Sequence, residues 1–425
     1  MHSSGTSETP GRRVSLAQLH RLEYDEARPR TVGTTVMKVV SLESDKHASV
    51  TCADVAAAWA QVIERHTVLR SVFPAGTHHA VTLDADVFGV RCVEADGDVE
   101  GAIDAEIQQW RADHTRTDRD PLARLVHIHN ADEPKALLLV DHLVFDGLSG
   151  EIVSHELQTL VRGDSLPALS FDYYDYAQRQ RDILAEQPSL TEYWVRRLAG
   201  TGIRPVLELP RAYPEIPGEH RPEIRRNLFP FGEHSAQNLV DVSRQYSTTP
   251  YAVAATCLLI AARRHQEGAS VGFVVPSAGR SIPGTENLVG FFANMLAVAV
   301  ELPDDPVEAL ATTTRAIFEA IDYDIVPKAH IIRTAYLEYR RDDPQEPYIF
   351  FDLARNRGTD NSKPALARRI PSSGTRTEPG LSIYLHVLSD EAWLEVHSTD
   401  AYTDQVMTAF EAEVARAFHV LHATL

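Results

Sequence analysis

The chain has 425 residues, which is more than one ordinary hydrophobic core contains, so we expect two domains. Its hydrophobic content of 44% is that of a globular protein, and 60 acidic against 41 basic side chains give a net charge of −19. Such an acidic chain lacks the basic surface that phosphate groups need, so we exclude nucleic acid and anionic membrane surfaces as partners.

The sequence shows neither an export signal nor a membrane span. Residues 1–13 are polar, and the longest apolar run, residues 251–262, is too short to cross a bilayer. The three cysteines, Cys52, Cys92 and Cys257, are odd in number and far apart, so we expect neither a ligand pattern nor a disulfide framework. This cysteine usage suits a reducing compartment, and we expect a cytoplasmic protein.

Strand and helix patterns begin after a tail at residues 1–13, which we predict to be disordered. Residues 35–42 indicate a strand. Thr51 and Asp54 form a capping box that starts a helix. The apolar positions of this helix fall on one face: Val55, Ala58, Trp59, Val62 and Ile63. Residues 68–73 follow as a second strand-like segment.

A histidine pair lies on a further strand, which is predicted at residues 122–128. Leu125, His127 and His129 alternate on one side of this strand. A His-x-His pair suits a metal ion, but no third ligand stands nearby in the sequence. We therefore predict that the chain has no metal site.

The stretch from Asp141 to Gly147, Asp-His-Leu-Val-Phe-Asp-Gly, is the most informative in the chain. It follows an apolar run at residues 136–140 that predicts a buried strand, and helical spacing follows over residues 148–161. His142 therefore lies at the exit of a strand and shortly before a helix. An imidazole titrates near neutral pH, so it is the natural side chain for moving a proton during a reaction.

The second half of the chain begins after a proline-rich connector at residues 165–214, which also includes a helix capped by Ser189. Thr249 and Pro250 then start a helix that is apolar nearly all round and should be buried. Strands are predicted at residues 271–275, 296–300, 381–387 and 393–397, and a final amphipathic helix at about residues 404–421. Because strands and helices do not alternate regularly, the sequence favours two α/β sandwich-like units over one doubly wound sheet.

Five further motifs accompany the histidine loop in order along the chain. They are Ser15-Leu16-Ala17-Gln18, the segment 65–73, the connector tyrosines at 173–177 with Tyr193-Trp194 and residues 207–210, the segment 276–280, and the segment 289–294. Together with residues 141–149 they resemble the motifs of condensation domains of nonribosomal peptide synthetases. These domains belong to the chloramphenicol-acetyltransferase-like superfamily of CoA-dependent acyltransferases. The resemblance covers about residue 14 to the end of the chain.

This resemblance implies an α/β fold of two chloramphenicol-acetyltransferase-like subdomains, residues 14–180 and 181–425. They would form a V-shaped pseudo-dimer around a central tunnel, with the histidine loop at its base. Phosphopantetheine arms of acyl or peptidyl carrier proteins would enter from opposite faces, one with a thioester donor and one with an amine acceptor. The implied activity is amide-forming acyl transfer in natural-product biosynthesis, by a monomer with no bound cofactor.

The resemblance makes His142 the catalytic residue, which accepts a proton from the attacking amine or, in a milder role, orients the acceptor. No covalent acyl-enzyme is needed, because a thioester is already activated. Asp146 shares the catalytic loop, where the resemblance implies a structural ion pair with Arg280 that holds the loop's shape. Gly147 allows close backbone approach, and its amide at a helix start suits a developing oxyanion.

Four polar residues are candidates to line the substrate tunnel: Asp141, Ser149, Asn294 and Asn356. The family usually has a second histidine where this chain has Asp141. The acting histidine is normally the one that corresponds to His142, so we expect the chemistry to survive this difference.

Two other functions stay open. An O-acyltransferase that makes an ester from a carrier or coenzyme A thioester and an alcohol needs the same loop. A catalytically inactive recruitment domain typically has a degenerate loop, whereas His142, Asp146, Gly147 and Arg280 are all present here.

The two ends of the chain and its arginine pairs suggest how it works with partners. The polar start and the complete final helix lead us to expect a free-standing protein rather than an excised domain. Carrier proteins are usually acidic, so docking would use local basic pairs: Arg196-Arg197, Arg225-Arg226, Arg263-Arg264 and Arg368-Arg369.

Overall fold

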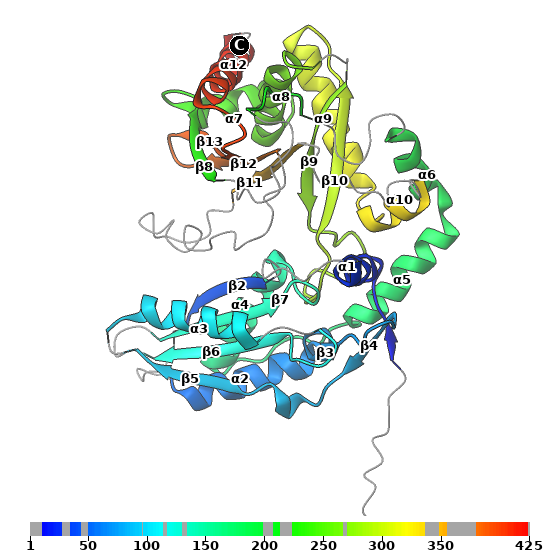
Figure 1. The fold of residues 1–425 in the computed structure, drawn as a ribbon, viewed down its shortest axis with the longest axis vertical. Coiled ribbons are helices and arrows are strands. Elements are labelled where there is room, and N and C mark those ends of the chain that lie inside the picture. The colour runs from blue at the N-terminus through cyan, green and yellow to red at the C-terminus, as the bar shows by residue number, and fades with distance from the viewer. Residues whose placement is uncertain are drawn as a thin grey trace, which may run out of the picture. The chain divides into compact units, whose positions relative to one another are not determined.

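The computed structural model of the chain describes residues 11–27, 35–43, 50–95, 97–113, 117–129, 134–198, 207–212, 223–266, 270–335, 348–354 and 380–423 (Figure 1). The chain divides into two compact units. The first consists of the residues up to Pro188 together with Ala278–Ala293, and the second of Ser189–Ser277 and the residues from Asn294 onward. The chain therefore returns once to the first unit, and this segment carries Arg280.

The first unit is built on a four-stranded sheet with the order β2-β7-β6-β5. The strands are β2 (Thr35–Ser41), β5 (Val90–Glu94), β6 (Ala123–His129) and β7 (Lys135–Asp141). β5 runs parallel to β6, and the other pairs are antiparallel. β2 and β5 are thus the edge strands of this sheet.

Helices cover both faces of this sheet. On one face lie α2 (Cys52–Arg65) and α4 (Gly147–Arg162), which pack against each other. On the other face lies α3 (Val99–Asp113), whose Ile103 and Trp110 join a core with alternate residues of β6 and β7. The predicted capping box of α2 is confirmed, because Thr51 Oγ1 accepts the Asp54 N–H and the Asp54 carboxylate accepts the Thr51 N–H. The five predicted apolar residues of α2 are all buried.

Smaller elements complete the first unit. They are the helices α1 (Leu16–Ala27) and α5 (Tyr173–Glu186) and a small antiparallel sheet of β1 (Arg12–Arg13), β3 (Ser71–Val72) and β4 (His79–Thr82). The strand predicted at residues 68–73 is wrong over most of its length, because residues 67–70 form a 3₁₀ turn. That turn continues directly from the end of α2, so its apolar residues are buried without strand pairing.

The second unit contains a six-stranded sheet with the order β10-β9-β11-β12-β13-β8. The strands are β8 (Ile224–Pro230), β9 (Ser270–Ser277), β10 (Asn294–Glu301), β11 (Tyr348–Leu353), β12 (Gly380–Val387) and β13 (Ala392–Thr399). β11 is parallel to both of its neighbours, and the remaining pairs are antiparallel. Each unit is therefore a mixed α/β layer structure, as the sequence predicted.

The helices of the second unit gather around α8 (Pro250–Arg263) (Figure 1). α8 contacts α7 (Ser235–Gln245), α9 (Pro306–Asp322) and α12 (Asp404–Ala423), and ten of its residues are buried. The sequence predicted this burial from the apolar composition of α8. Two shorter helices are α6 (Pro188–Arg197) and α10 (Lys328–Ala335). Of the helices that the structure describes, none has the length and apolarity to cross a bilayer.

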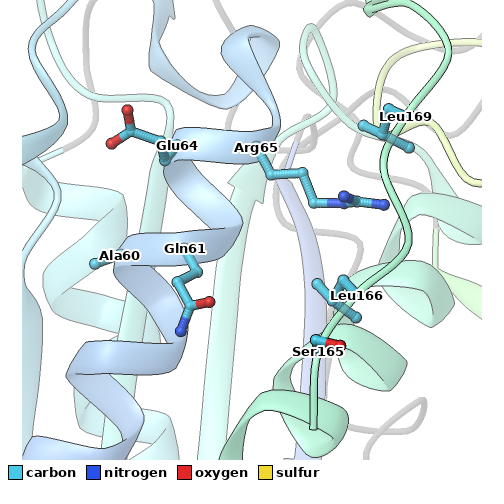
Figure 2. Close-up of a pocket in the computed structure, with 7 residues that line it drawn as sticks. All are labelled: Ala60, Gln61, Glu64, Arg65, Ser165, Leu166 and Leu169. Carbon is cyan, nitrogen blue, oxygen red and sulfur yellow. The ribbon is translucent and has the colours of Figure 1, made fainter.

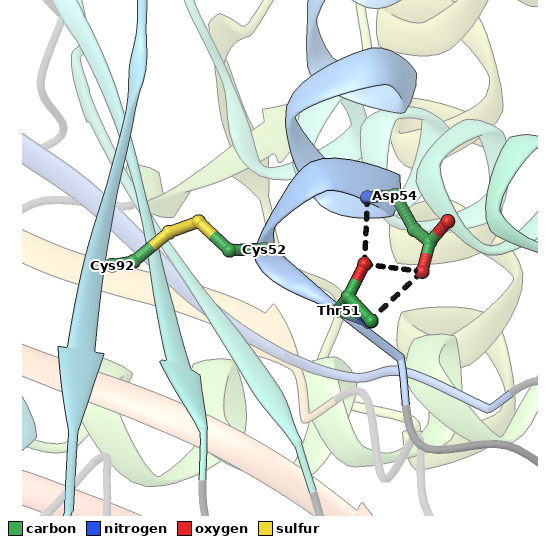
Figure 3. Close-up of a disulfide and its surroundings, with 4 residues drawn as sticks. All are labelled: Thr51, Cys52, Asp54 and Cys92. Atoms are coloured by element: carbon green, nitrogen blue, oxygen red, sulfur yellow. Dashed lines mark hydrogen bonds between the residues drawn. A yellow bond between two sulfur atoms is a disulfide. The ribbon is translucent and has the colours of Figure 1, made fainter.

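The expectation that the cysteines form no pair is wrong. Cys52, the first residue of α2, forms a disulfide with Cys92 in β5, with 6.2 Å between their Cα atoms (Figure 3). The two are 40 residues apart in sequence, and packing of α2 over β5 and β6 brings them together. Cys257 is a free, buried thiol in α8.

Candidate active site

The histidine loop joins β7 to α4 in the first unit, and hydrogen bonds at both sides fix its path. Asp141 ends β7, and its carboxylate accepts the Leu143 N–H at 2.8 Å. Val144 N donates to the Asp141 carbonyl at 3.1 Å. From α1, Gln18 Nε2 donates to the Leu143 carbonyl at 2.9 Å. The backbone that carries His142 is thus held by its own turn and by a second helix.

The His142 ring is partly exposed and packs edge-on against Phe291, with ring centroids 5.0 Å apart and an interplanar angle of 71°. Its Nδ1 atom is buried and makes no hydrogen bond to any residue that the structure describes. The backbone of Phe291 is itself held, because Tyr173 Oη donates to its carbonyl at 2.7 Å. Burial raises the pKa of Tyr173 well above its usual value, so this hydroxyl remains a donor.

Asp146 is the N-cap of α4, and its carboxylate is fully engaged by hydrogen-bond donors. One oxygen accepts the backbone N–H and the hydroxyl of Ser149, both at 2.8 Å. The other accepts the Phe292 N–H at 3.1 Å. Arg280 donates to both oxygens, at 2.9 and 3.1 Å. Both oxygens of the Asp146 carboxylate are therefore engaged by other groups of the protein.

The ion pair between Asp146 and Arg280 is buried, with 2% and 5% of the two side chains exposed. Arg280 also donates to the Leu288 and Ala278 carbonyls at 3.1 Å and to Ser149 Oγ at 3.0 Å. Its guanidinium lies over the Phe292 ring, 4.2 Å from the centroid. A buried charge needs this degree of compensation. The pair ties the segment that carries Phe291 to the loop that carries His142.

Gly147 is the first residue of α4 and faces open space. A Cβ atom built on it would meet no heavy atom within 4 Å, and its φ lies outside the left-handed region that favours glycine. Local packing therefore does not require a glycine here. The first N–H groups of a helix lack intrahelical acceptors. Asp146 accepts that of Ser149, so we expect the earlier Gly147 N–H to be the donor for an oxyanion.

We expect Gly147→Ala to fold with native stability but to lower kcat/KM for acyl transfer about 10- to 100-fold. The added methyl group of the alanine would displace the reacting group of the substrate by about 1 Å. Thermal unfolding and steady-state kinetics of the same preparation would measure both effects. A matched control is Gly279→Ala, because Gly279 has a φ of 62° and an added Cβ would collide with the Phe292 carbonyl oxygen. That control should lose stability. Native activity in Gly147→Ala would contradict a substrate-facing role for this position.

The structure gives most of the predicted tunnel residues structural contacts. Asp141 and Ser149 are buried and bonded within the loop as described above. Asn294 lies at the start of β10 in the second unit, where both hydrogens of its amide go to the Asp324 and Val326 carbonyls and its oxygen accepts the Lys328 N–H. These contacts favour structural roles for all three. Asn356 lies outside the described residues.

Three residues that hold the site were not singled out as site residues from the sequence. Phe291 contacts the His142 ring, Tyr173 holds Phe291, and Gln18 holds the histidine loop. Gln18 also forms a reciprocal pair with Ser15, in which each side chain accepts the other's backbone N–H at 3.0 Å. All three belong to the ordered motifs, and that membership was the available signal.

The arginine pairs predicted to attract a carrier protein are largely neutralised. Each of the following arginines forms an ion pair with an acidic residue: Arg196 with Glu192, Arg225 with Asp404, Arg226 with Glu395, Arg263 with Asp304, and Arg264 with Glu413. Arg368 and Arg369 lie outside the described residues. These contacts weaken the case for the described pairs as basic docking patches.

A surface groove of about 640 Å³ lies at the C-terminal half of α2 (Figure 2). It is lined by Ala60, Gln61, Glu64, Arg65, Ser165, Leu166 and Leu169. Arg65 is anchored to Glu156 at 2.8 Å. Ser165 follows the end of α4, a helix of 16 residues and thus about 24 Å long, whereas the histidine loop precedes its start. The groove is therefore separate from the histidine loop.

Comparison with known proteins identifies the same family over most of the chain. The family model for condensation domains matches residues 39–350, which is more than half of the chain. Phosphinothricin tripeptide synthetase PhsB of Streptomyces viridochromogenes is 32% identical over 284 residues, which are 63% of this chain and 24% of that protein. Gramicidin S synthase 2 of Brevibacillus brevis is 31% identical over 307 residues, which are 68% of this chain and 6% of that protein. The chain thus spans a quarter or less of these relatives' length.

Solved structures show the same fold at lower identity. The condensation domain of the Monacolin K polyketide synthase MokA matches with a TM-score of 0.75 at 17% identity, covering 98% of both chains. The X-domain from teicoplanin biosynthesis matches with a TM-score of 0.73 at 17% identity, covering 99% of this chain and 96% of that one. The match of the family model over residues 39–350 and the matching fold agree with the ordered motifs around the histidine loop. The chain belongs to the family of condensation domains that are found in nonribosomal peptide synthetases.

Proposed function

We propose that this protein transfers an acyl or aminoacyl group from a phosphopantetheine thioester on a carrier protein to an amine, and so forms an amide bond. The observation that carries the proposal is the intact histidine loop, in which His142 stays partly exposed while Asp146 and Arg280 lock the backbone around it. A catalytically inactive recruitment domain typically has a degenerate loop, whereas His142, Asp146, Gly147 and Arg280 are all present here.

The reaction needs two proton transfers and two bond changes at the carbonyl. The amine nitrogen attacks the thioester carbon, the C–N bond forms and the C–S bond breaks. His142 takes a proton from the attacking nitrogen and passes it to the departing sulfur, which leaves as a thiol. The Gly147 amide, at the N-terminus of α4, stabilises the oxyanion of the tetrahedral intermediate.

Asp146 does not act on the imidazole in this proposal. Its two oxygens are taken by Arg280, Ser149 and Phe292, and none of its hydrogen bonds goes to His142. The site therefore differs from a Ser-His-Asp arrangement, in which the carboxylate orients the histidine. Asp146 is a positioning residue, and no acyl-enzyme forms.

We also propose the setting in which this reaction takes place. The first unit contains the predicted acyltransferase-like subdomain of residues 14–180, and the second unit contains most of the predicted subdomain of residues 181–425. The substrates arrive on carrier proteins in the cytoplasm. The acyl transfer itself needs no bound cofactor, because the thioester supplies the activation.

The reaction class can be tested with a carrier protein that is loaded with a series of acyl groups and mixed with a panel of amines and alcohols. We expect amide products by mass spectrometry, and faster reaction from the carrier thioester than from the matching coenzyme A thioester. Ester products without amides would instead establish an O-acyltransferase. Binding of the carrier with no product from any pair would establish a recruitment domain, and either outcome would contradict the proposal.

A further inference from the structure

Cys52, Cys92 and His127 meet in the first unit on the face of the sheet that α2 covers. Each offers one metal-ligand atom, and these three atoms all lie within 4.8 Å of one another. Figure 3 shows the two sulfur atoms between the start of α2 and β5. The sequence predicted no third ligand near the histidines, because the cysteines come from elements far from them in sequence.

His127 is the unusual member of this cluster. Its side chain is buried, with 1% of the residue exposed, and neither ring nitrogen has a hydrogen-bond partner among the described residues. Buried polar atoms in proteins are nearly always partnered, so such a ring calls for a ligand. The neighbouring His129 only stacks against it, with 5.9 Å between ring centroids, and such a contact satisfies neither nitrogen.

The backbone places all three ligands independently of the bond between the sulfurs. Cys92 and His127 are paired residues of the parallel strands β5 and β6. Cys52 is the first residue of α2 and lies between Thr51 and Asp54, the two residues of the capping box. The positive end of a helix dipole stabilises a thiolate at this position.

We propose that, when Cys52 and Cys92 are reduced, they and His127 bind a zinc-type divalent ion, with one coordination position open to water. The disulfide is the oxidised form of the same site, and this form binds no metal. Two thiolates and an imidazole are ligands that zinc prefers, whereas magnesium and calcium require oxygen. The Cα separation of 6.2 Å suits a disulfide, and it also suits two sulfurs about 3.8 Å apart on one tetrahedral ion.

A phosphine reductant converts the disulfide form into the dithiol form. Reduction adds two electrons and two protons to the disulfide, and the phosphine becomes its oxide with oxygen from water. The metal ion then displaces the two thiol protons. Cys92 is exposed on an edge strand of the sheet, which gives the ion a path to the buried imidazole. The inference uses no residue of the histidine loop and does not rest on the proposed acyl transfer.

The test uses the full chain, reduced with a phosphine, desalted without oxygen and titrated with Co²⁺ as a spectroscopic substitute for Zn²⁺. We expect one ion per chain, a sulfur-to-cobalt charge-transfer band of two thiolates, and displacement of cobalt by Zn²⁺. Cys52→Ser, Cys92→Ser and His127→Gln should each weaken zinc binding at least about tenfold. Cys257→Ser and His129→Gln are matched controls that should bind as the native chain does.

Two results would overturn the inference. One is a reduced native chain that shows no charge-transfer band, and the other is zinc affinity that is unchanged by Cys52→Ser and Cys92→Ser. Because the native chain alone gives the first readout, a variant that fails to fold does not prevent a decision. Circular dichroism of each variant identifies such a failure.

Discussion

Replacing Asp146 with alanine is expected to lower the free energy of unfolding of the first unit by about 3–5 kcal/mol. The change leaves the Arg280 guanidinium buried with no counter-charge, and it also removes the N-cap of α4 and the acceptor of the Phe292 N–H. Urea denaturation measures the loss. Hydrogen-exchange mass spectrometry of β6 and β7 peptides assigns the transition to the first unit.

A double-mutant cycle separates the ion pair from the other contacts of Asp146. Arg280→Met removes the charge and keeps much of the packing, so Asp146→Ala combined with Arg280→Met should cost about 1–3 kcal/mol less than the sum of the single changes. Lys38→Ala is a control in the same unit, because its ion pair with Glu151 is about one-third exposed and should contribute less than about 1 kcal/mol. Additive effects in the cycle would contradict the role that we assign to the pair.

Replacing His142 with alanine is expected to lower kcat for amide formation by about 100- to 10,000-fold while the protein keeps its native stability. The ring is partly exposed and packs in a T-shaped contact with Phe291, so its loss should change the free energy of unfolding by no more than about 0.5 kcal/mol. Steady-state kinetics with the acceptor amine as the varied substrate separates kcat from KM.

His142→Gln distinguishes the two roles that the sequence left open. Glutamine can hydrogen-bond an amine but cannot take its proton at neutral pH, so a base role predicts that this variant is as slow as His142→Ala. Recovery of most of kcat by glutamine would mean that His142 only orients the acceptor. A raised KM with unchanged kcat in both variants would contradict a role in the chemical step.

The sequence predicted the elements whose signals are local. The helix after the histidine loop begins at Gly147, and the cap of α2 lies at Thr51 as expected. The Asp146–Arg280 ion pair is also present, although it joins residues 134 apart, and it was expected because both lie in ordered family motifs. Composition and spacing alone would not have paired these two residues.

Features that depend on long-range packing were not predicted. β5 is a short edge strand with charged and exposed residues, so it lacks the apolar pattern of a buried strand. Because β5 was missed, nothing in the sequence brought Cys92 to Cys52 or to His127. The role of Gln18 was not predicted for the same reason, because its hydrogen bond to the Leu143 carbonyl joins residues 125 apart in sequence.

In this account His142 takes the proton during acyl transfer, and Asp146 and Arg280 hold its loop in place. The most direct test is a single-turnover reaction of acyl-loaded carrier protein with an amine, followed by the mass of the carrier as it loses its acyl group. We predict rapid loss with the native chain and a rate at least about 100-fold lower with folded His142→Ala. Equal rates of acyl loss from the two proteins would contradict the claim.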